Sequence, residues 1–426
     1  MTSSPPSSLL HDSDVRRYLT GQLAAEIGSR ITREGLPIVA IVAASASAPE
    51  LAILAALSTL PSLAMGNWAG HWVDKSRRRP VLIGANLARA AVLFAIPLLY
   101  ALHRLTFLAI AAVTVLAGGA GIVTAVARHA YLPSLVGRTR LEEGNELVGT
   151  AESIGETTGP GIMGLLIQWV GGPLSIAFDA LSNVASAVLL LTIARPEDRP
   201  EAPSETSQTR EAPLSLGAVW SRVGRHPILR PLLLNAGATA FFRGFFSTLY
   251  ELYVLKTLHL SPLALGLLIT LGGLGSLVGT RLLRSVRRHV RMGVMIGGSF
   301  LLYALLNFAV PAAHGSRWLA FSFLFLAQFG GDLFGTIFDI GATTVEQQVT
   351  PDHWLGRVHG TFRALGGGLE VVGALTAGPL ALWLSVRSTF WIAAGGFLVS
   401  GLFLMAKPLR ILDAPAPEFW QGFDAS

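Results

Sequence analysis

Long apolar runs recur along this 426-residue chain and limit its possible folds more than any other feature. Residues 81–101 and 107–127 are two examples. Each is close to the ~20 residues that an α-helix needs to cross the hydrocarbon core of a bilayer. Only 14% of the residues are charged, whereas an ordinary soluble domain carries about 25%. The chain therefore cannot cover large soluble cores with charge, and we predict an integral membrane protein.

Apolar length, turn residues and charge clusters divide the chain into two sets of six spans. The first set is predicted at 17–44, 50–72, 80–102, 105–128, 143–169 and 173–194. The second set is predicted at 228–255, 262–283, 292–313, 317–344, 358–384 and 387–407. The expected fold class is an all-α integral membrane protein with twelve transmembrane helices in two pseudo-symmetric six-helix bundles.

These spans set the predicted domain boundaries. They give a tail at 1–16, one bundle at 17–194, a linker at 195–227, a second bundle at 228–407 and a tail at 408–426. The linker is rich in Pro, Ser, Thr and Glu, and 214–223 within it has an amphipathic pattern. Lys and Arg gather in the linker and in alternate loops, so the positive-inside rule places both termini in the cytoplasm.

The two halves also resemble each other, as parallel repeats about an axis along the membrane normal would. An offset of 218 positions aligns Glu152 with Glu370. An offset of 213 positions aligns Arg30 with Arg243. Since both matches fall in corresponding spans, we expect the bundles to share one helix arrangement.

A charged motif follows the second span, at 70–82. It consists of Gly70, Asp74, Lys75, Arg77, Arg78 and Arg79. The glycine, the acid four residues later and the basic cluster resemble the signature of the major facilitator superfamily. The resemblance implies that Gly70 lets two helices approach closely and that Asp74 pairs at a neighbouring helix end as part of a gate. An ordinary positive-inside loop is the alternative explanation.

In the fifth span, Gly155, Gly159 and Pro160 resemble the glycine–proline motif of antiporters in this superfamily. Such a segment can bend and seal a pathway, although plain packing of small residues explains it equally well. The loops at 130–147 and 349–358 resemble those of the branch that holds drug, macrolide and siderophore exporters. The resemblance covers nearly the whole chain.

Ionisable residues at membrane depth form the next group of candidates, because charges in a bilayer are costly and mark function by default. They are Glu26, Arg30, Arg33, Glu34, Arg243, Glu251, Asp332 and Asp339. In this superfamily the first, fourth, seventh and tenth helices line the cavity, so the resemblance places these residues in the transport pathway. The alternative is that they form structural ion pairs. Arginine does not release its proton, so we expect Asp339 or Asp332 to carry the transported proton, with Arg30 and Arg243 as partners of that acid or of an anionic cargo group.

Other residues are expected to be structural. Asp179 is predicted to cap the amino terminus of the sixth span. The absence of cysteine and of any metal-binding spacing or nucleophile–base pair predicts no metal, no cofactor and no enzyme. The basic residues lie between apolar runs, which excludes nucleic acid as a partner. The apolar lining of the cavity is expected from Phe241, Phe242, Phe245, Phe246, Tyr250 and Phe338.

Together, the motifs and the resemblance predict a secondary transporter of the bacterial inner membrane that exports small amphipathic or lipophilic compounds by proton antiport. Its expected partners are the lipid bilayer, a small-molecule substrate and protons, and we expect a monomer. A dedicated siderophore exporter or lysophospholipid transporter is one alternative. A non-transporting receptor or scaffold is another.

The first prediction is topological. Accessibility labelling should place residues 75–79, the linker and both termini in the cytoplasm, because the basic residues are concentrated there. Labelling that puts the two termini on opposite sides of the membrane would eliminate the twelve-span arrangement.

Overall fold

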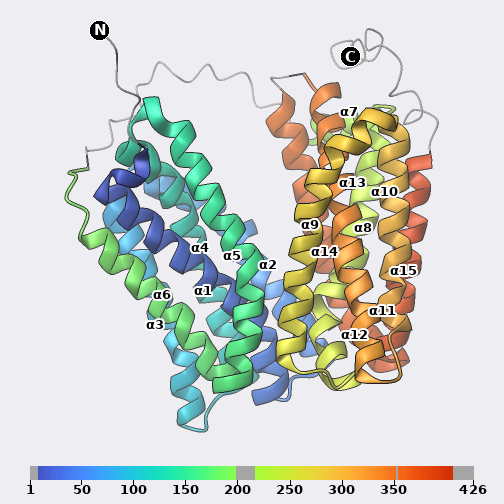
Figure 1. Ribbon diagram of the computed structural model, residues 1–426, viewed down its shortest axis with the longest axis horizontal. Helices are drawn as coiled ribbons and strands as arrows, with labels where there is room; N and C mark the ends of the chain where they lie inside the picture. The colour runs from blue at the N-terminus through green and yellow to red at the C-terminus, as the bar shows by residue number, and fades with distance from the viewer. Residues whose placement is uncertain (1–7, 198–215, 352–353, 406–426) are drawn as a thin grey trace. The chain divides into compact units, whose positions relative to one another are not determined.

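The computed structural model describes residues 8–197, 216–351 and 354–405, and these ranges are helical apart from caps and short loops. The all-α fold class is therefore confirmed (Figure 1). The chain divides into two compact units, the first of residues 1–46 and 57–208 and the second of residues 47–56 and 209–426. Of the predicted linker at 195–227, residues 198–215 lie outside the described residues, as do residues 1–7 of the first predicted tail and the whole of the second predicted tail at 408–426.

The first unit is built from six helices. They are α1 (Ser13–Ala43), α2 (Ala48–Asp74), α3 (Arg78–Ala101), α4 (Phe107–Val136), α5 (Leu141–Val170) and α6 (Gly172–Leu191). Asp12 caps α1, because its side chain accepts the backbone N–H of Asp14 at 2.9 Å. A buried core that includes Tyr18, Tyr131 and Leu190 holds α1, α4 and α6 together.

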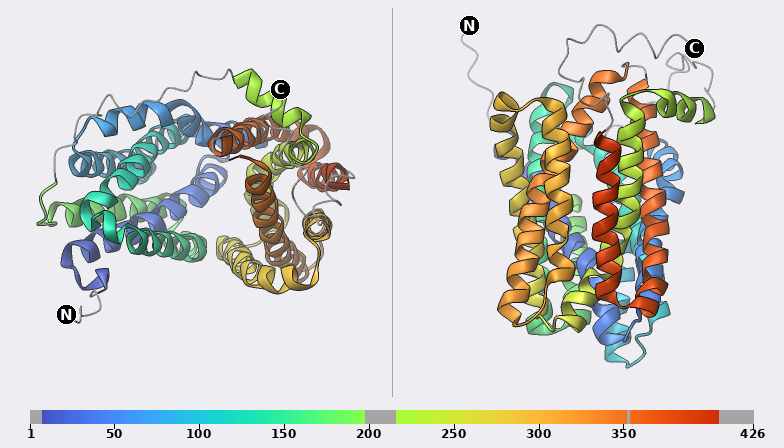
Figure 2. Two further views of the ribbon diagram at one scale, coloured as in Figure 1. Left: turned by 90° about the horizontal axis from the view of Figure 1, so that it is seen from above. Right: turned by 90° about the vertical axis from the view of Figure 1, so that its right-hand side faces the viewer.

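The second unit begins with the first turns of α2 and continues through the rest of the chain. Its helices are α7 (Leu216–Arg225), α8 (Leu229–Leu252), α9 (Pro262–His289), α10 (Met292–Asn307), α11 (Ala309–Ala312), α12 (Arg317–Phe325), α13 (Gly331–Val349), α14 (Leu355–Leu384) and α15 (Val386–Gly401). A π-turn, Leu326–Gly330, joins α12 to α13, so that both form one span. Figure 2 shows the short α7 at the end of this unit where α8 begins. Val219 and Val223 anchor α7 in the core.

Nine of the described segments are long and apolar enough to cross a membrane. The predicted spans outside this set are α1, α5 and α8. These three carry charged side chains along their length, including Glu26, Glu156 and Arg243. Their place in the units therefore depends on how those charges are paired.

The register of the internal repeat differs from the one expected for the fifth helix of each half. Leu141 begins α5 and Leu355 begins α14, which are 214 positions apart. Both helices have 30 residues, and both are followed by a residue with positive φ, Gly171 and Ser385. The offset of 218 is thus wrong by four residues. Because that is about one helical turn, the shifted alignment keeps each side chain on nearly the same face.

A buried ion pair joins α3 to α6 in the first unit. Nη2 of Arg89 lies 3.1 Å from Oδ2 of Asp179, whose side chain is 0% exposed. Asp179 also accepts a hydrogen bond of 2.7 Å from Asn183, and Arg89 donates one of 3.1 Å to Ser29 of α1. The expectation that Asp179 caps α6 is wrong, since that helix begins seven residues earlier, at Gly172.

Replacing Arg89 with methionine should lower the free energy of unfolding in detergent by about 3–5 kcal/mol, because it leaves the Asp179 carboxylate buried without its counter-charge. The double variant Arg89→Met/Asp179→Leu should recover most of that loss. Arg104→Met, at an exposed base, is the control and should change stability by less than about 0.5 kcal/mol. Equal stability of the single variant and the wild type would show that the pair contributes nothing.

Candidate transport site

Three charged side chains from three helices meet inside the first unit. Arg128 of α4 pairs through Nη1 with Oε1 of Glu26 on α1. Its Nη2 lies 3.0 Å from Oε1 of Glu152 on α5. Gln22 donates a further hydrogen bond of 3.0 Å to Glu26. The arginine is thus held between two carboxylates, and its position is fixed from both sides.

Arg30 pairs with the neighbouring helix and not with an acid of its own. Its Nη2 lies 2.9 Å from Oε1 of Glu156 on α5. A Cβ at Gly159 would collide with the Arg30 side chain, and one at Gly155 would lie 2.9 Å from Cβ of Glu26. The glycines of the predicted motif on α5 therefore pack directly against Glu26 and Arg30, two of the predicted charged residues on α1.

The rest of the predicted stripe on α1 is separate from this contact. Nε of Arg33 lies 3.5 Å from Oε1 of Glu34, and the Arg33 side chain is 66% exposed. Pro160 is buried within α5, which continues through it to Val170. Among the candidates of the first unit, the structure therefore brings together Glu26, Arg30, Gly155 and Gly159.

The second unit contains a cavity of about 360 Å³ between α8, α13 and α14. Its apolar wall includes Leu232, Phe338 and Phe362. Its ionisable lining consists of Arg243, Asp339, Glu346, His359 and Arg363. The volume lies in the range of small-molecule sites, and the mixture of aromatic and charged walls suits an amphipathic ligand.

Two side-chain pairs engage three of these five ionisable residues. Nη2 and Nε of Arg243 donate to Oε2 of Glu370 at 3.1 and 3.2 Å. Nδ1 of His359 lies 3.2 Å from Oε1 of Glu346. Asp339 on α13 and Arg363 on α14 have no ion pair or side-chain hydrogen bond within the described ranges. One carboxylate and one guanidinium are therefore left for a ligand.

Two predicted acids lie outside the cavity lining. Asp332 packs on Gly272 of α9, where an added Cβ would collide with its carboxylate. Glu251 is buried near the end of α8. Of the six aromatic residues expected to form the wall, Phe338 alone belongs to it. Phe242, Phe245 and Phe246 pack on other aromatic rings.

The residues of the charged motif occupy the turn between α2 and α3. Within the first unit, nothing among the described residues lies within 4 Å of a Cβ built at Gly70, and the expected close helix contact at this glycine stays a prediction. Asp74 and Lys75 are exposed, and Asp74 has no ion pair with any described residue. Arg79 is engaged differently, because its guanidinium donates to the carbonyls of Leu190 and Leu191 at the end of α6.

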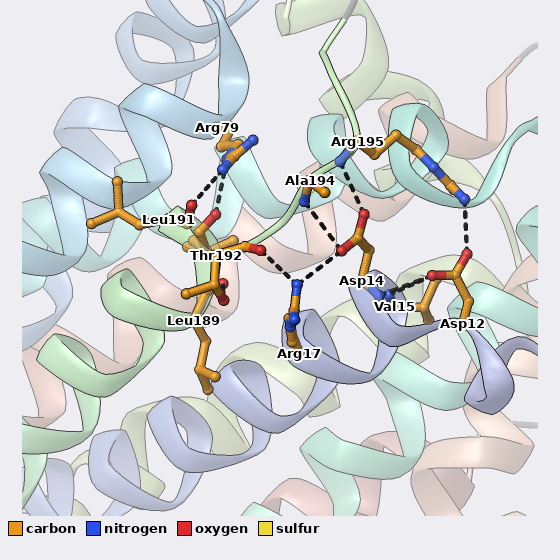
Figure 3. A network of polar contacts seen from close by, with 11 residues as sticks. Asp12, Asp14, Val15, Arg17, Arg79, Leu189, Leu191, Thr192, Ala194 and Arg195 are labelled. Atoms are coloured by element: carbon orange, nitrogen blue, oxygen red, sulfur yellow. Dashed lines mark hydrogen bonds and ion pairs between the residues drawn. The ribbon is translucent and has the colours of Figure 1, made fainter.

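The chain after α6 is tied to this turn and to α1 (Figure 3). Glu197 accepts the backbone N–H groups of Arg78 and Arg79 at 2.6 and 3.0 Å, which caps α3. Asp14 accepts the backbone N–H groups of Ala194 and Arg195 at 3.2 and 2.9 Å. The backbone N–H groups of Arg78, Arg79 and Arg195 and the guanidinium of Arg79 therefore all bond within the first unit.

Arg195 links this network to two further elements. Its guanidinium donates to the carbonyl of Leu135 in α4 and to Oδ2 of Asp12 at 2.8 Å. Burial alone would raise the pKa of Asp12, but the N–H groups of Asp14 and Val15 and the charge of Arg195 together lower it. The carboxylate is thus ionised at neutral pH, and its stabilising effect is lost only as the pH falls through that lowered pKa.

Asp14→Ala should release the segment after α6, because two backbone N–H groups lose their acceptor. Hydrogen exchange at the amides of Ala194 and Arg195 should become at least ~10-fold faster, the factor that corresponds to ~1.4 kcal/mol. Glu142→Ala, at an exposed acid, is the control and should leave both rates unchanged. Unchanged exchange in Asp14→Ala would contradict the bonding in Figure 3.

Several of these residues were not selected from the sequence. They are Arg89, Arg128, Glu156 and Arg363. Each is a charge inside an apolar or small-residue span, so the rule that selected Arg243 would also have found them. Glu152 and Glu370 entered only through the repeat.

Comparison with known proteins gives a family match and relatives that cover between 65% and 93% of this chain. The profile of the Major Facilitator Superfamily matches residues 21–369. The multidrug efflux pump Tap of Mycolicibacterium fortuitum is 28% identical over 406 residues, which cover 93% of this chain and 96% of the pump. The enterobactin exporter EntS of Salmonella typhimurium is 27% identical over 283 residues, which cover 65% of this chain and 64% of the exporter.

A solved structure supports the same fold. The crystal structure of a bacterial homologue of the iron transporter ferroportin, in an inward-facing state, aligns with a TM-score of 0.71 at 16% identity. The alignment covers 94% of this chain and 99% of that protein. At this identity the likeness concerns the fold alone.

Proposed function

Because this chain belongs to the major facilitator superfamily, it is a multi-pass membrane transporter and not an enzyme, and we propose that it exports small amphipathic compounds from the bacterial cytoplasm in exchange for protons. The observation that carries the proposal is the cavity of the second unit, where an acid that has no ion pair among the described residues faces aromatic walls. The similarity to a multidrug efflux pump over most of both chains supports export.

The proposed orientation has both termini in the cytoplasm. It is supported by the distribution of Lys and Arg, which are concentrated at the ends of helices on the side of the termini. On this side Asp74 is exposed and has no ion pair among the described residues, so it is available to a partner in another state of the transport cycle. On that basis Asp74 is the proposed gating acid.

Asp339 is the proposed proton carrier. Its carboxylate is exposed to the cavity, so that protons and cargo can reach it, whereas Asp332 is packed against α9. The nearby Arg243 is paired with Glu370 and is therefore not committed to Asp339. Protonation of Asp339 removes a negative charge of the lining that has no ion pair among the described residues, which changes the affinity for any charged or polar cargo and thereby couples the two fluxes.

Transport into inverted vesicles tests this function. A panel of labelled amphipathic compounds should accumulate when a pH gradient is imposed, and Asp339→Asn should reduce this accumulation at least ~10-fold, a loss of ~1.4 kcal/mol in coupling. Asp332→Asn, on the same helix but outside the cavity, is the matched comparison and should retain pH-driven accumulation.

Three outcomes would contradict parts of the proposal. Accumulation that is the same with and without the gradient excludes proton coupling. Loss of coupling in Asp332→Asn alone moves the proton site to the contact with α9. Transport restricted to enterobactin favours the narrower function that the enterobactin exporter's name describes.

A further inference from the structure

The internal repeat allows corresponding places in the two units to be compared. Glu156 of α5 and Glu370 of α14 are 214 positions apart. Glu156 pairs with Arg30 of α1, and Glu370 pairs with Arg243 of α8, which are the first long helices of the two units. The arginines are 213 positions apart. The same interhelical arginine–glutamate pair is thus present in both units, and it fixes the alignment of the two units to within one residue.

With that alignment, the cavity corresponds to the Glu26–Arg128–Glu152 cluster of the first unit. The offset of 213 places Glu26 on Thr239, and the offset of 214 places Glu152 on Gly366. Thr239 and Gly366 both line the cavity. Where the first unit has two carboxylates that hold an arginine, the second unit has short side chains and open space.

The fourth helix of each unit supplies the centre of this place. α4 runs from Phe107 to Val136 and its counterpart from Arg317 to Val349, so the offset is between 210 and 213. Arg128 therefore corresponds to the segment 338–341, which contains Asp339. The central charge is reversed, and in the second unit it has no ion pair among the described residues.

We propose that the cavity of the second unit binds zwitterionic amphipathic cargo, with a cationic group on Asp339, an anionic group on Arg363 and an apolar body against Phe338 and Phe362. This inference rests on the proposed transport function, because it names the class of cargo. In the first unit, Arg128 occupies the corresponding place as an internal cation between carboxylates. In the second unit the cargo supplies that cation.

The charge of the lining favours a cargo with both signs over a plain cation. Arg243 is neutralised by Glu370, and Glu346 faces His359. A cargo with a cation alone would leave Arg363 without a counter-charge, and one with an anion alone would leave Asp339 without one. A ligand with both groups can form two ion pairs in this cavity, whereas a ligand with one charged group can form only one.

Binding of a matched probe set to the purified full-length protein in detergent tests this assignment at fixed pH and without a gradient. The set is a naphthyl-bearing amino acid, its methyl ester, its N-acetyl derivative and the doubly blocked compound, each at two spacings between amine and carboxyl. The zwitterion should bind at least ~10-fold more tightly than either singly blocked compound, since each blocked group loses one ion pair.

Two substitutions separate the roles of the charged residues. Asp339→Asn should abolish the preference for the free amine and keep that for the free carboxylate, and Arg363→Gln should do the reverse. Glu146→Gln and Arg288→Gln, at exposed sites outside the cavity, are the matched controls and should keep both preferences. This pattern cannot arise from a general loss of folding, because each variant retains half of the selectivity.

The outcomes also separate this inference from the proposed function. Equal binding of all four probes, or a carboxylate preference that survives Arg363→Gln, overturns the zwitterion assignment even if pH-driven export persists. Selective binding that follows the predicted pattern, together with no pH-driven accumulation, supports the assignment and overturns proton antiport.

Discussion

Ion pairs between neighbouring helices are the interaction on which the rest of this structure depends. A charge in the interior of a bundle is destabilising unless a partner offsets its loss of hydration. Arg128 holds carboxylates of α1 and α5, Arg89 holds Asp179 of α6, and Arg243 holds Glu370 of α14. The charged helices α1, α5 and α8, which fall outside the set of plainly apolar spans, pack in their units because these pairs form.

Glycines make the same pairs possible. Gly159 faces Arg30 in the first unit, and Gly373 lies so close to the Phe241 carbonyl in the second that a Cβ would collide with it. With the backbones this close, a glutamate on the fifth helix reaches the arginine on the first without extending into lipid. The close packing of the backbones and the ion pairs therefore depend on each other, and a side chain added at Gly159 or Gly373 would disturb both the packing and the ion pair.

The sequence carries the fold class and only part of the site. Apolar length locates the spans, because the bilayer sets that length, and the predicted bounds agree with the helices to within a few residues for most spans. Partner choice depends on helix rotation and neighbours, which periodicity does not give. Arg30 was expected to partner the proton-carrying acid or an anionic group of the cargo, but it pairs with Glu156. Asp179 was expected to cap a helix end, whereas it forms a buried pair with Arg89. The sequence does not reveal this partner, because Arg89 is 90 positions away in the chain.

The two units use one backbone arrangement for different ends. Both units have an ion pair between an arginine and a glutamate, on α1 and α5 in the first unit and on α8 and α14 in the second, so this pair is not what distinguishes them. The difference lies one helical turn away, where Glu26, Arg128 and Glu152 fill the first unit and the cavity opens in the second. In the first unit both carboxylates contact the single guanidinium of Arg128, and the three long side chains fill the space between the helices. In the second unit the two carboxylates are absent and the central charge is reversed, which leaves both space and a carboxylate without an ion pair among the described residues, and this is the binding site that we propose.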